Sequence, residues 1–231
     1  MCGRFSLTAT MAALSQHYQL DSASDGIPPV PPSYNITPSQ VVIAITASPS
    51  GSRTVQPLRW GLVPAWKKTF EGGLINARSE TAAQKPSFRQ ALRQRRCLIA
   101  ADGFYEWHNK QPYFFRLEPM GIFSFAGLWE RWRGEDGTEI DTCTILNTSA
   151  NSLMRPLHER MPVILHPHHY DLWLDPQVRD PHLVQPLLQP YPSHDMVAYP
   201  VSPWVNSPRH NDARCQEPLT VDAETLLVEQ P

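Results

Sequence analysis

Short apolar runs, rich in β-branched and aromatic residues and separated by proline or glycine, recur along most of this chain. Runs of this kind are typical of β-strands, whereas the stretches that favour helices are few and short. The predicted strands span residues 41–46, 55–60, 97–105, 113–117, 123–128, 143–147 and 163–165, and the predicted helices span 9–18, 87–95, 168–174 and 183–188. Together they predict an α+β fold, a single domain around a curved, mostly antiparallel and barrel-like sheet with short peripheral helices.

Proline is the unusual feature of the composition. The 24 prolines among 231 residues amount to roughly twice the average usage, which indicates many rigid turns and excludes coiled coils, collagen and helical solenoids. No internal repeat and no linker divides the chain, so we expect one domain over residues 1–219 and a peripheral tail over 220–231.

Several sequence features limit where the protein acts and what it binds. The chain has no run of about 20 apolar residues and no signal-peptide pattern, so we expect no membrane span and a cytoplasmic protein, associated with the nucleoid if the source is bacterial. Its four cysteines form no C-x-x-C pair, which in a reducing compartment indicates free thiols. The cluster His166, His168 and His169 is interrupted by Pro167, so we interpret it as a helix start and expect neither a metal nor another cofactor. We also expect a monomer.

The charge is distributed unevenly. The net charge is −2, yet residues 53–96 hold ten Lys and Arg against two Glu, a local +8. Such asymmetry points to a polyanionic partner. Lys85, Arg89 and Arg93 recur every four residues and would share one face of the predicted helix. A solvated helix face explains the same spacing, so both interpretations stay open.

Cys2 is the first candidate for chemistry. Removal of the initiator methionine, which the small residues Cys2 and Gly3 favour, would place an α-amine and a thiol on adjacent carbons. Their ordinary pKa values are about 7.7–8.0 and about 8.5, so both titrate near neutrality. The amine could form a Schiff base with an aldehyde, and the thiol could then close a thiazolidine ring. The alternative is an incidental residue at a frayed terminus.

Glu106 and His158 are candidates for proton transfer. Glu106 lies in A-D-G-F-Y-E-W after an apolar run, where burial would favour the protonated form that a general acid requires. It could equally face outward from a strand. His158, in L-H-E-R-M-P-V-I-L, can exchange a proton at physiological pH, and Arg160 would project to the same side of an extended segment. A surface loop histidine is the alternative.

Asn76 and Arg78, in L-I-N-A-R-S-E-T, have side chains suited to a sugar hydroxyl and to a phosphate, respectively. Trp60 and Trp66 bracket W-G-L-V-P-A-W and could belong to the core or form a platform for an exposed base. The end of a strand favours a core position for Trp60. Trp66, beside Lys67 and Lys68, is the better stacking candidate.

Five blocks in order resemble one family. These blocks are M-C-G-R-F, W-G-L-V-P-A-W, L-I-N-A-R-S-E-T, A-D-G-F-Y-E-W and L-H-E-R-M-P-V-I-L. They resemble the SRAP (SOS-response-associated peptidase) family over nearly the whole chain, from Cys2 to about Asn206. The resemblance implies a DNA-damage-response protein that binds abasic sites in single-stranded DNA and cross-links to them through a thiazolidine at the mature N-terminal cysteine.

The resemblance also implies residue roles. Cys2 corresponds to the nucleophile, and Asn76, Glu106 and His158 correspond to the other catalytic residues. Arg4, Arg78 and Arg160 correspond to phosphate contacts, with Trp66 as a further DNA-binding residue. Lyase and peptidase-like self-processing activities are additional expectations.

Two other functions use the same residues. One is a hydrolase with an N-terminal cysteine nucleophile, or a Cys–His–Asn peptidase, which would release a product and turn over. The other is a module that binds single-stranded DNA without a covalent step, for which the basic segment and the tryptophans would suffice.

Overall fold

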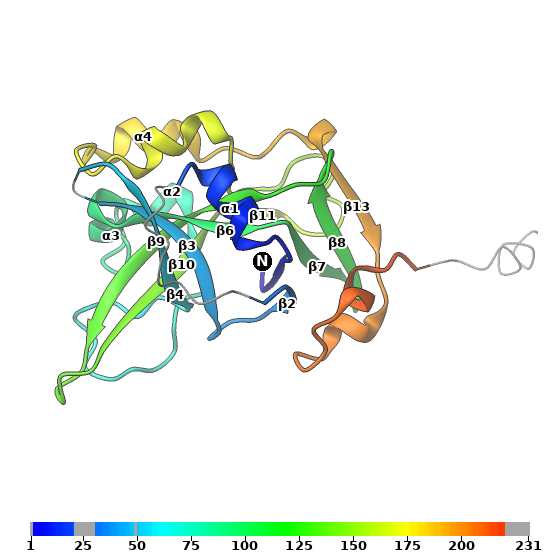
Figure 1. The fold of residues 1–231 in the computed structure, drawn as a ribbon, viewed down its shortest axis with the longest axis horizontal. Helices are drawn as coiled ribbons and strands as arrows, with labels where there is room; N and C mark the ends of the chain where they lie inside the picture. Colours follow the sequence, from blue (N-terminus) through cyan, green and yellow to red (C-terminus); the bar gives the residue numbers. More distant parts are fainter. Residues whose placement is uncertain (1, 21–30, 49, 220–231) are drawn as a thin grey trace, which may run out of the picture.

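Two β-sheets form the framework of the molecule (Figure 1). The computed structural model describes residues 2–20, 31–48 and 50–219, so the predicted tail at 220–231 lies outside the described residues. The smaller sheet has the strand order β13-β8-β7-β1-β2. Its strands are β1 (Arg4–Leu7), β2 (Ser33–Ile36), β7 (Gly103–His108), β8 (Gln111–Leu117) and β13 (Met196–Pro200).

The larger sheet closes into a five-stranded barrel. Its order is β11-β10-β4-β3-β6-β9-β12, and an additional pairing of β9 with β10 joins the ends of the run β10-β4-β3-β6-β9. The barrel strands are β3 (Val41–Ala47), β4 (Arg53–Trp60), β6 (Arg96–Ala101), β9 (Phe123–Arg133) and β10 (Glu139–Ser149), with β5 (Asn76–Arg78), β11 (Arg160–Pro162) and β12 (Ile164–Leu165) at its edges. Only the pairings of β10 with β4 and β5 are parallel among the described strands. The predicted single α+β domain with a mostly antiparallel, barrel-like core is confirmed.

The helices are short. They are α1 (Met11–Tyr18), α2 (Ser79–Ala82), α3 (Arg89–Gln94), α4 (Tyr170–Leu174) and α5 (Pro181–Val184), with further 3₁₀ turns. The histidine cluster begins a helix as predicted, since a 3₁₀ turn over Pro167–His169 leads into α4. The single helix predicted over 183–188 is wrong, because Pro186 falls inside it and the chain continues as a 3₁₀ turn after Val184. In the described part of the chain, none of the helices has both the length and the apolar character needed to cross a membrane.

The single strand predicted over 97–105 is also wrong, because the chain turns a corner at Asp102 between β6 and β7. The buried Asp102 carboxylate accepts hydrogen bonds from the hydroxyls of Ser6 and Thr8, both at 2.6 Å. Gly103 follows, and a Cβ there would lie 2.0 Å from the ring of Phe114, so only glycine fits. The hydrogen bonds of Asp102 hold β1 beside β7, where Phe5 pairs with Phe104.

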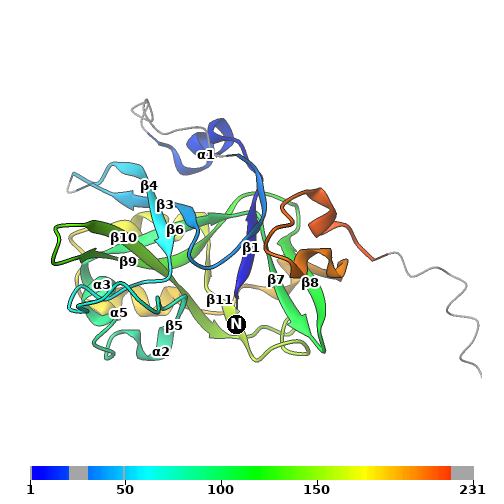
Figure 2. The ribbon, with the colours of Figure 1, turned by 90° about the horizontal axis from the view of Figure 1, so that it is seen from below.

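β1 connects the two halves of the core. The ring of Phe5 is fully buried and lies 5.1 Å from the ring of Trp60 and 5.6 Å from that of Phe125, both in the barrel. Figure 2 shows β1 running between the barrel strands and β7 and β8. Trp60 therefore belongs to the core, as its position at a strand end favoured. All four cysteines are buried free thiols, which confirms that expectation.

The basic segment does not form one patch of free cations. Arg53 pairs with Asp171 and Arg95 with Glu130, each at 2.6 Å. The side chain of Arg96 is buried and donates to backbone carbonyls. The predicted row of three cations on one helix face is wrong as well, because α3 begins only at Arg89 and Lys85 lies in the preceding turn.

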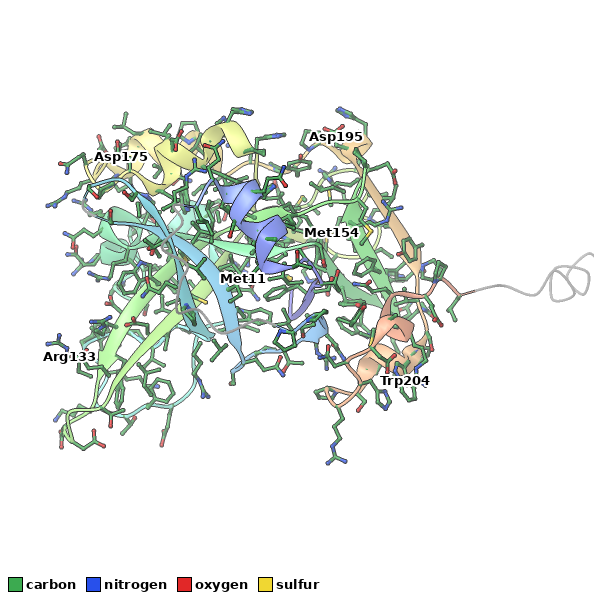
Figure 3. The ribbon with its side chains drawn as sticks, in the orientation of Figure 1. Met11, Arg133, Met154, Asp175, Asp195 and Trp204 are labelled. Carbon is green, nitrogen blue, oxygen red and sulfur yellow. The ribbon has the colours of Figure 1, made fainter. Side chains whose placement is uncertain are left out.

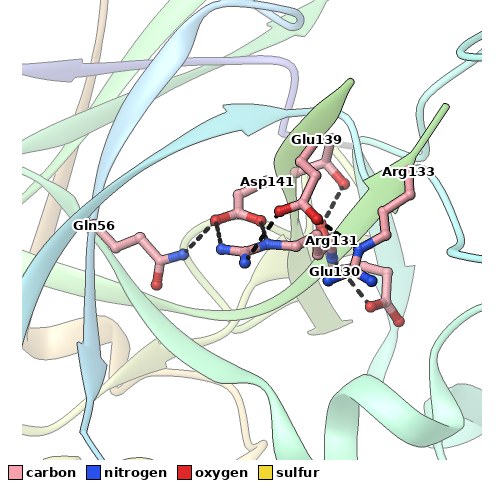
Figure 4. A network of polar contacts seen from close by, with 7 residues as sticks. Gln56, Glu130, Arg131, Arg133, Glu139 and Asp141 are labelled. Atoms are coloured by element: carbon pink, nitrogen blue, oxygen red, sulfur yellow. Dashed lines mark hydrogen bonds and ion pairs between the residues drawn. The ribbon is translucent and has the colours of Figure 1, made fainter. Parts of the chain in front are cut away.

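β9 and β10 continue beyond the barrel as a hairpin whose charged side chains pair with one another (Figure 4). Arg131 donates to both oxygens of Asp141, at 2.7 and 2.8 Å, and Gln56 donates to the same carboxylate. Arg133 pairs with Glu139 at 2.7 Å. We call these residues, with Arg95 and Glu130, the hairpin network. Arg133 and Trp204 lie toward opposite ends of the molecule (Figure 3).

Candidate active site

Cys2 lies immediately before an interior strand of the smaller sheet. β1 is hydrogen-bonded to β7 on one side and to β2 on the other. Only 1% of the Cys2 surface is exposed, and its Sγ lies 3.7 Å from the backbone oxygen of Arg4, to which it can donate. The structure therefore fixes Cys2 inside the molecule, which is the opposite of a frayed terminus.

Asn76 reaches Cys2 from the barrel side. It lies on β5, paired with β10, and its Nδ2 donates a 2.9 Å hydrogen bond to the backbone oxygen of Cys2. Its Oδ1 is buried and has no hydrogen-bond partner among the described residues. A buried acceptor without a donor is uncommon because it costs free energy, and its usual reasons include a missing ligand or a catalytic role. The side-chain amide of Asn76 thus donates to Cys2 through Nδ2, and its Oδ1 is able to accept a hydrogen bond from another group.

Glu106 lies in the smaller sheet, to which β1 also belongs. It lies on β7, next to the residues of β7 that pair with β1, and 6% of its surface is exposed. Burial and then the negative charge of Glu106 raise the pKa of the Cys2 thiol. The charge of Glu106 therefore acts on the Cys2 thiol across the smaller sheet. Cys2, Asn76 and Glu106, far apart in the sequence, therefore form one group.

His158 lies just before β11. Its Nδ1 lies 2.9 Å from the backbone nitrogen of Arg160, from which it can accept a hydrogen bond, and 3.2 Å from the backbone oxygen of Arg160, to which it can donate one. In the tautomer that accepts at Nδ1, the ring proton is on Nε2. This half-buried ring is therefore oriented by the backbone of β11, and in that tautomer Nε2 is the atom that could donate a proton.

Arg160 is held by two side chains that sequence reasoning missed. Its guanidinium donates to both oxygens of Glu80, at 2.6 and 2.8 Å, and to Oδ1 and the backbone oxygen of Asn147, at 2.8 Å each. Asn147, on β10, is 1% exposed. An amide inside the otherwise apolar run at 145–147 was the available signal for it. Glu80 carried no comparable signal, because a glutamate in the first turn of a helix is commonplace.

Arg78 differs from Arg160 in its surroundings. It lies two residues after Asn76 on β5, and its side chain is exposed. The side chain of Arg78 makes no hydrogen bond or ion pair with another described residue. Arg78 pairs in register with Asn147, so the two arginines flank the same end of β10.

Arg4 joins the start of the chain to a distant segment. Its guanidinium donates to Oδ1 of Asn35 at 2.8 Å and to the backbone oxygens of Val205 and Asn206, at 2.7 and 3.1 Å. Beside it, Gly3, Arg4, Trp107 and Asn206 line an open depression of about 410 Å³. Arg4 therefore holds the segment at 205–206 against the start of the chain. Its contact with a phosphate stays a prediction.

Trp66 is 67% exposed, as a stacking platform requires. It lies in the loop that leads from β4 to β5 and so to Asn76. In residues 2–20, 31–48 and 50–219, no three His, Cys, Asp or Glu side chains are grouped so that they could hold a metal ion.

The comparisons with known proteins agree with one another. The model of the SOS response associated peptidase (SRAP) family matches residues 1–208. The abasic site processing protein YoqW of Bacillus subtilis is 44% identical over 219 residues, which is 91% of this chain and 96% of that protein. The abasic site processing protein HMCES of Rattus norvegicus is 28% identical, over 87% of this chain and 67% of that protein. A crystal structure from Bacteroides thetaiotaomicron superposes with a TM-score of 0.84 at 29% identity, covering 95% of this chain and all of that one.

Proposed function

This chain belongs to the SRAP family, and on that premise we propose that it processes abasic sites in single-stranded DNA by forming a covalent cross-link. The cross-link is a thiazolidine between the DNA aldehyde and the amine and thiol of a mature, N-terminal Cys2. The names of the relatives support abasic-site processing.

The reaction needs three proton transfers that the site residues can make. The abasic sugar first opens from its hemiacetal to the aldehyde. The Cys2 amine adds to the aldehyde carbon, and the carbinolamine loses one water when its hydroxyl is protonated, which leaves an imine. The Cys2 sulfur then adds to the imine carbon, while the thiol proton passes to a base and on to the ring nitrogen. The adduct therefore has the mass of protein plus DNA minus one water.

One observation carries the proposal: the side-chain amide of Asn76 donates a hydrogen bond to the backbone oxygen of Cys2. This contact orients the residue whose amine and thiol both react. We assign to Glu106, whose charge raises the pKa of the Cys2 thiol, the acceptance of the thiol proton during ring closure. We assign to His158 the proton that opens the sugar, delivered from Nε2. The buried Oδ1 of Asn76 is left to accept a hydrogen bond from a sugar hydroxyl.

The chemistry of the thiol distinguishes this proposal from a cysteine peptidase. A peptidase needs a thiolate, and its cysteine pKa is lowered by a neighbouring cation. Burial and Glu106 act in the opposite direction and raise the pKa of Cys2. In thiazolidine formation the amine attacks first, so no free thiolate is required at that step.

The proposal is tested with two forms of the same protein, one that begins at Cys2 and one that retains Met1. Mass spectrometry establishes each N-terminus. Both are incubated with a single-stranded oligonucleotide that contains one abasic site and are analysed on a denaturing gel. We expect a heat-stable adduct only from the form that begins at Cys2, since the amide nitrogen of the other is not nucleophilic. Efficient cross-linking by protein that retains Met1 would contradict the mechanism.

A matched duplex substrate serves as the control. A paired abasic sugar cannot reach the buried terminus, so we expect much slower adduct formation with it. Release of product with repeated turnover, in place of a stable adduct, would favour the hydrolase.

A further inference from the structure

The carboxylate of Glu80 lies against Arg160, one of the candidate phosphate contacts. Arg160 donates to both of its oxygens, at 2.6 and 2.8 Å, in the fork geometry that arginine also uses for phosphate. The hydrogen bonds of Arg160, and to a smaller extent the charge of Arg78, lower the pKa of Glu80. The protein's own carboxylate thus already occupies the position on Arg160 that a phosphate would take.

The two side chains that hold Arg160 do so in different ways. Asn147 is buried and neutral, so it orients the guanidinium without cancelling its charge. Glu80 cancels the charge, and half of its side chain is exposed (50%, against 20% for Arg160). A pair whose carboxylate is half exposed contributes only modestly to stability. Another anion can therefore displace the carboxylate at a modest cost, whereas the contact with the neutral Asn147 does not compete with an anion.

We propose that Glu80 is a built-in competitor of DNA, whose carboxylate occupies the position of a backbone phosphate on Arg160 until single-stranded DNA displaces it. The inference rests on the proposed function, because that function makes Arg160 a phosphate contact. Displacement lowers the affinity for every strand equally, damaged or intact. Intact DNA then leaves quickly, and an abasic strand is retained by the covalent bond.

The proposal predicts that removing the carboxylate strengthens non-covalent binding. Fluorescence anisotropy measures the affinity for an intact single-stranded oligonucleotide that carries no abasic site, at low salt. We expect Glu80→Gln to tighten binding by about two- to fivefold, the factor that corresponds to an exposed ion pair. It should also steepen the dependence of log K on log salt by about 0.7, the value for one more phosphate contact on a single strand.

Two controls separate competition from a general charge effect. Glu135→Gln removes the same charge at the exposed turn of the β9–β10 hairpin, far from the site, and should leave the affinity unchanged. Arg160→Ala removes the arginine, and in that background Glu80→Gln should no longer tighten binding. Glu80→Asp retains the charge but is too short to engage both arginine nitrogens at once, so it should lie between wild type and Glu80→Gln.

The outcomes are decisive in both directions. Equal tightening by Glu135→Gln, or tightening by Glu80→Gln that persists without Arg160, overturns the proposal. Unchanged or weaker binding by Glu80→Gln overturns it too, and would make Glu80 a residue that positions Arg160. Because the DNA is intact, this result is independent of the cross-link. Tighter binding to intact DNA, together with no adduct on the abasic oligonucleotide, would refute the proposed covalent chemistry alone. An adduct on the abasic oligonucleotide without tighter binding to intact DNA would refute only the competitor.

Discussion

Two glutamates are buried to nearly the same extent, Glu106 beside Cys2 with 6% exposure and Glu130 in the hairpin network with 8%. Glu130 accepts a 2.6 Å hydrogen bond from Arg95 and another from the backbone N–H of Arg131. Arg95 thus offsets the cost of burying that charge. Glu106 instead lies beside a thiol, a group that can exchange a proton.

The same contrast holds for the arginines. In the hairpin network each arginine faces a carboxylate of the protein, as Arg131 faces Asp141 and Arg133 faces Glu139. At the candidate site Arg160 is paired as well, with Glu80, whereas Arg78 is exposed and makes no ion pair with another described residue. Charges that pair with one another stabilise the hairpin, whereas the exposed charge of Arg78 is available for binding.

The largest expected effect comes from removing the thiol. Cys2→Ala should abolish the heat-stable adduct completely, because the ring cannot close. The remaining amine should still form an imine that borohydride traps. Cys143→Ala is the matched control on β10 of the hairpin: it should cost about 1 kcal/mol of stability through lost packing and leave the adduct intact. Denaturing gels with and without borohydride make the measurement, and an unreduced, heat-stable adduct from Cys2→Ala would refute the thiazolidine.

Replacing each of the two glutamates by glutamine tests the difference between them. Glu106→Gln should slow adduct formation by about 10²–10⁴-fold, the usual contribution of a general acid or base, with little change in DNA affinity. Glu130→Gln should leave the rate unchanged and lower the free energy of unfolding by about 1–3 kcal/mol, because a hydrogen bond to a charged group is weakened. Rates come from quenched time courses and stabilities from urea titrations. The pattern fails if Glu130→Gln slows the chemistry as much as Glu106→Gln does.

Salt dependence distinguishes the two sets of arginines. Arg78→Ala should reduce the slope of log K against log salt by about 0.7, because one single-strand phosphate contact is lost. Arg131→Ala, at the hairpin, should leave the slope as it is. Anisotropy titrations between about 50 and 200 mM salt span the range in which such contacts are measurable. An unchanged slope for Arg78→Ala would show that this residue does not touch phosphate.

The smallest effect concerns pH and the hairpin network. The hydrogen bonds of Arg131 lower the pKa of Asp141 below its ordinary 3.8. Folding therefore favours the ionised form, and this contribution is complete above pH 3.8 and disappears as the pH falls through 3.8 and below. Because the pair is partly exposed, Arg131→Ala should lower the free energy of unfolding by less than about 1 kcal/mol near neutral pH. Urea titrations at falling pH should show the difference between variant and wild type shrinking; a constant difference would contradict the pairing.

The sequence allowed the barrel-like, mostly antiparallel core to be predicted because apolar runs such as 41–46 and 55–60 become strands with little change in their bounds. Short strands such as β1 and β5 were missed because so few residues give no pattern, and pairing with β7 and β10 stabilises them. The corner at Asp102 was missed because it depends on hydrogen bonds to Ser6 and Thr8, about 95 residues away in the chain.

At the candidate site, too, local sequence patterns could be interpreted and contacts between distant residues could not. Cys2, Asn76 and Glu106 could be named from their local sequence blocks, and the structure brings them together. The partners of Arg4 could not be anticipated, since two of them are backbone carbonyls, which every residue has. Glu80 was likewise not predictable, and the amide of Asn147 in a predicted strand did not indicate its partner, because only the pairing of β5, β10 and β11 brings both residues to Arg160.

The position of β1 inside its sheet has a consequence for the order of events on the ribosome. Cys2 and β1 are the first residues synthesised, but β7, which covers them, begins only at Gly103. At about 5–20 residues per second, the intervening 100 or so residues take roughly 5–20 s to make. During that interval the beginning of the chain has no β7 to pair with and stays open to an aminopeptidase. Once β7 has emerged and paired, only 1% of the Cys2 surface is exposed. Under the proposed function, we therefore expect release of the amine to be easiest while the chain is still growing, so that the pace of translation influences the fraction of molecules able to react.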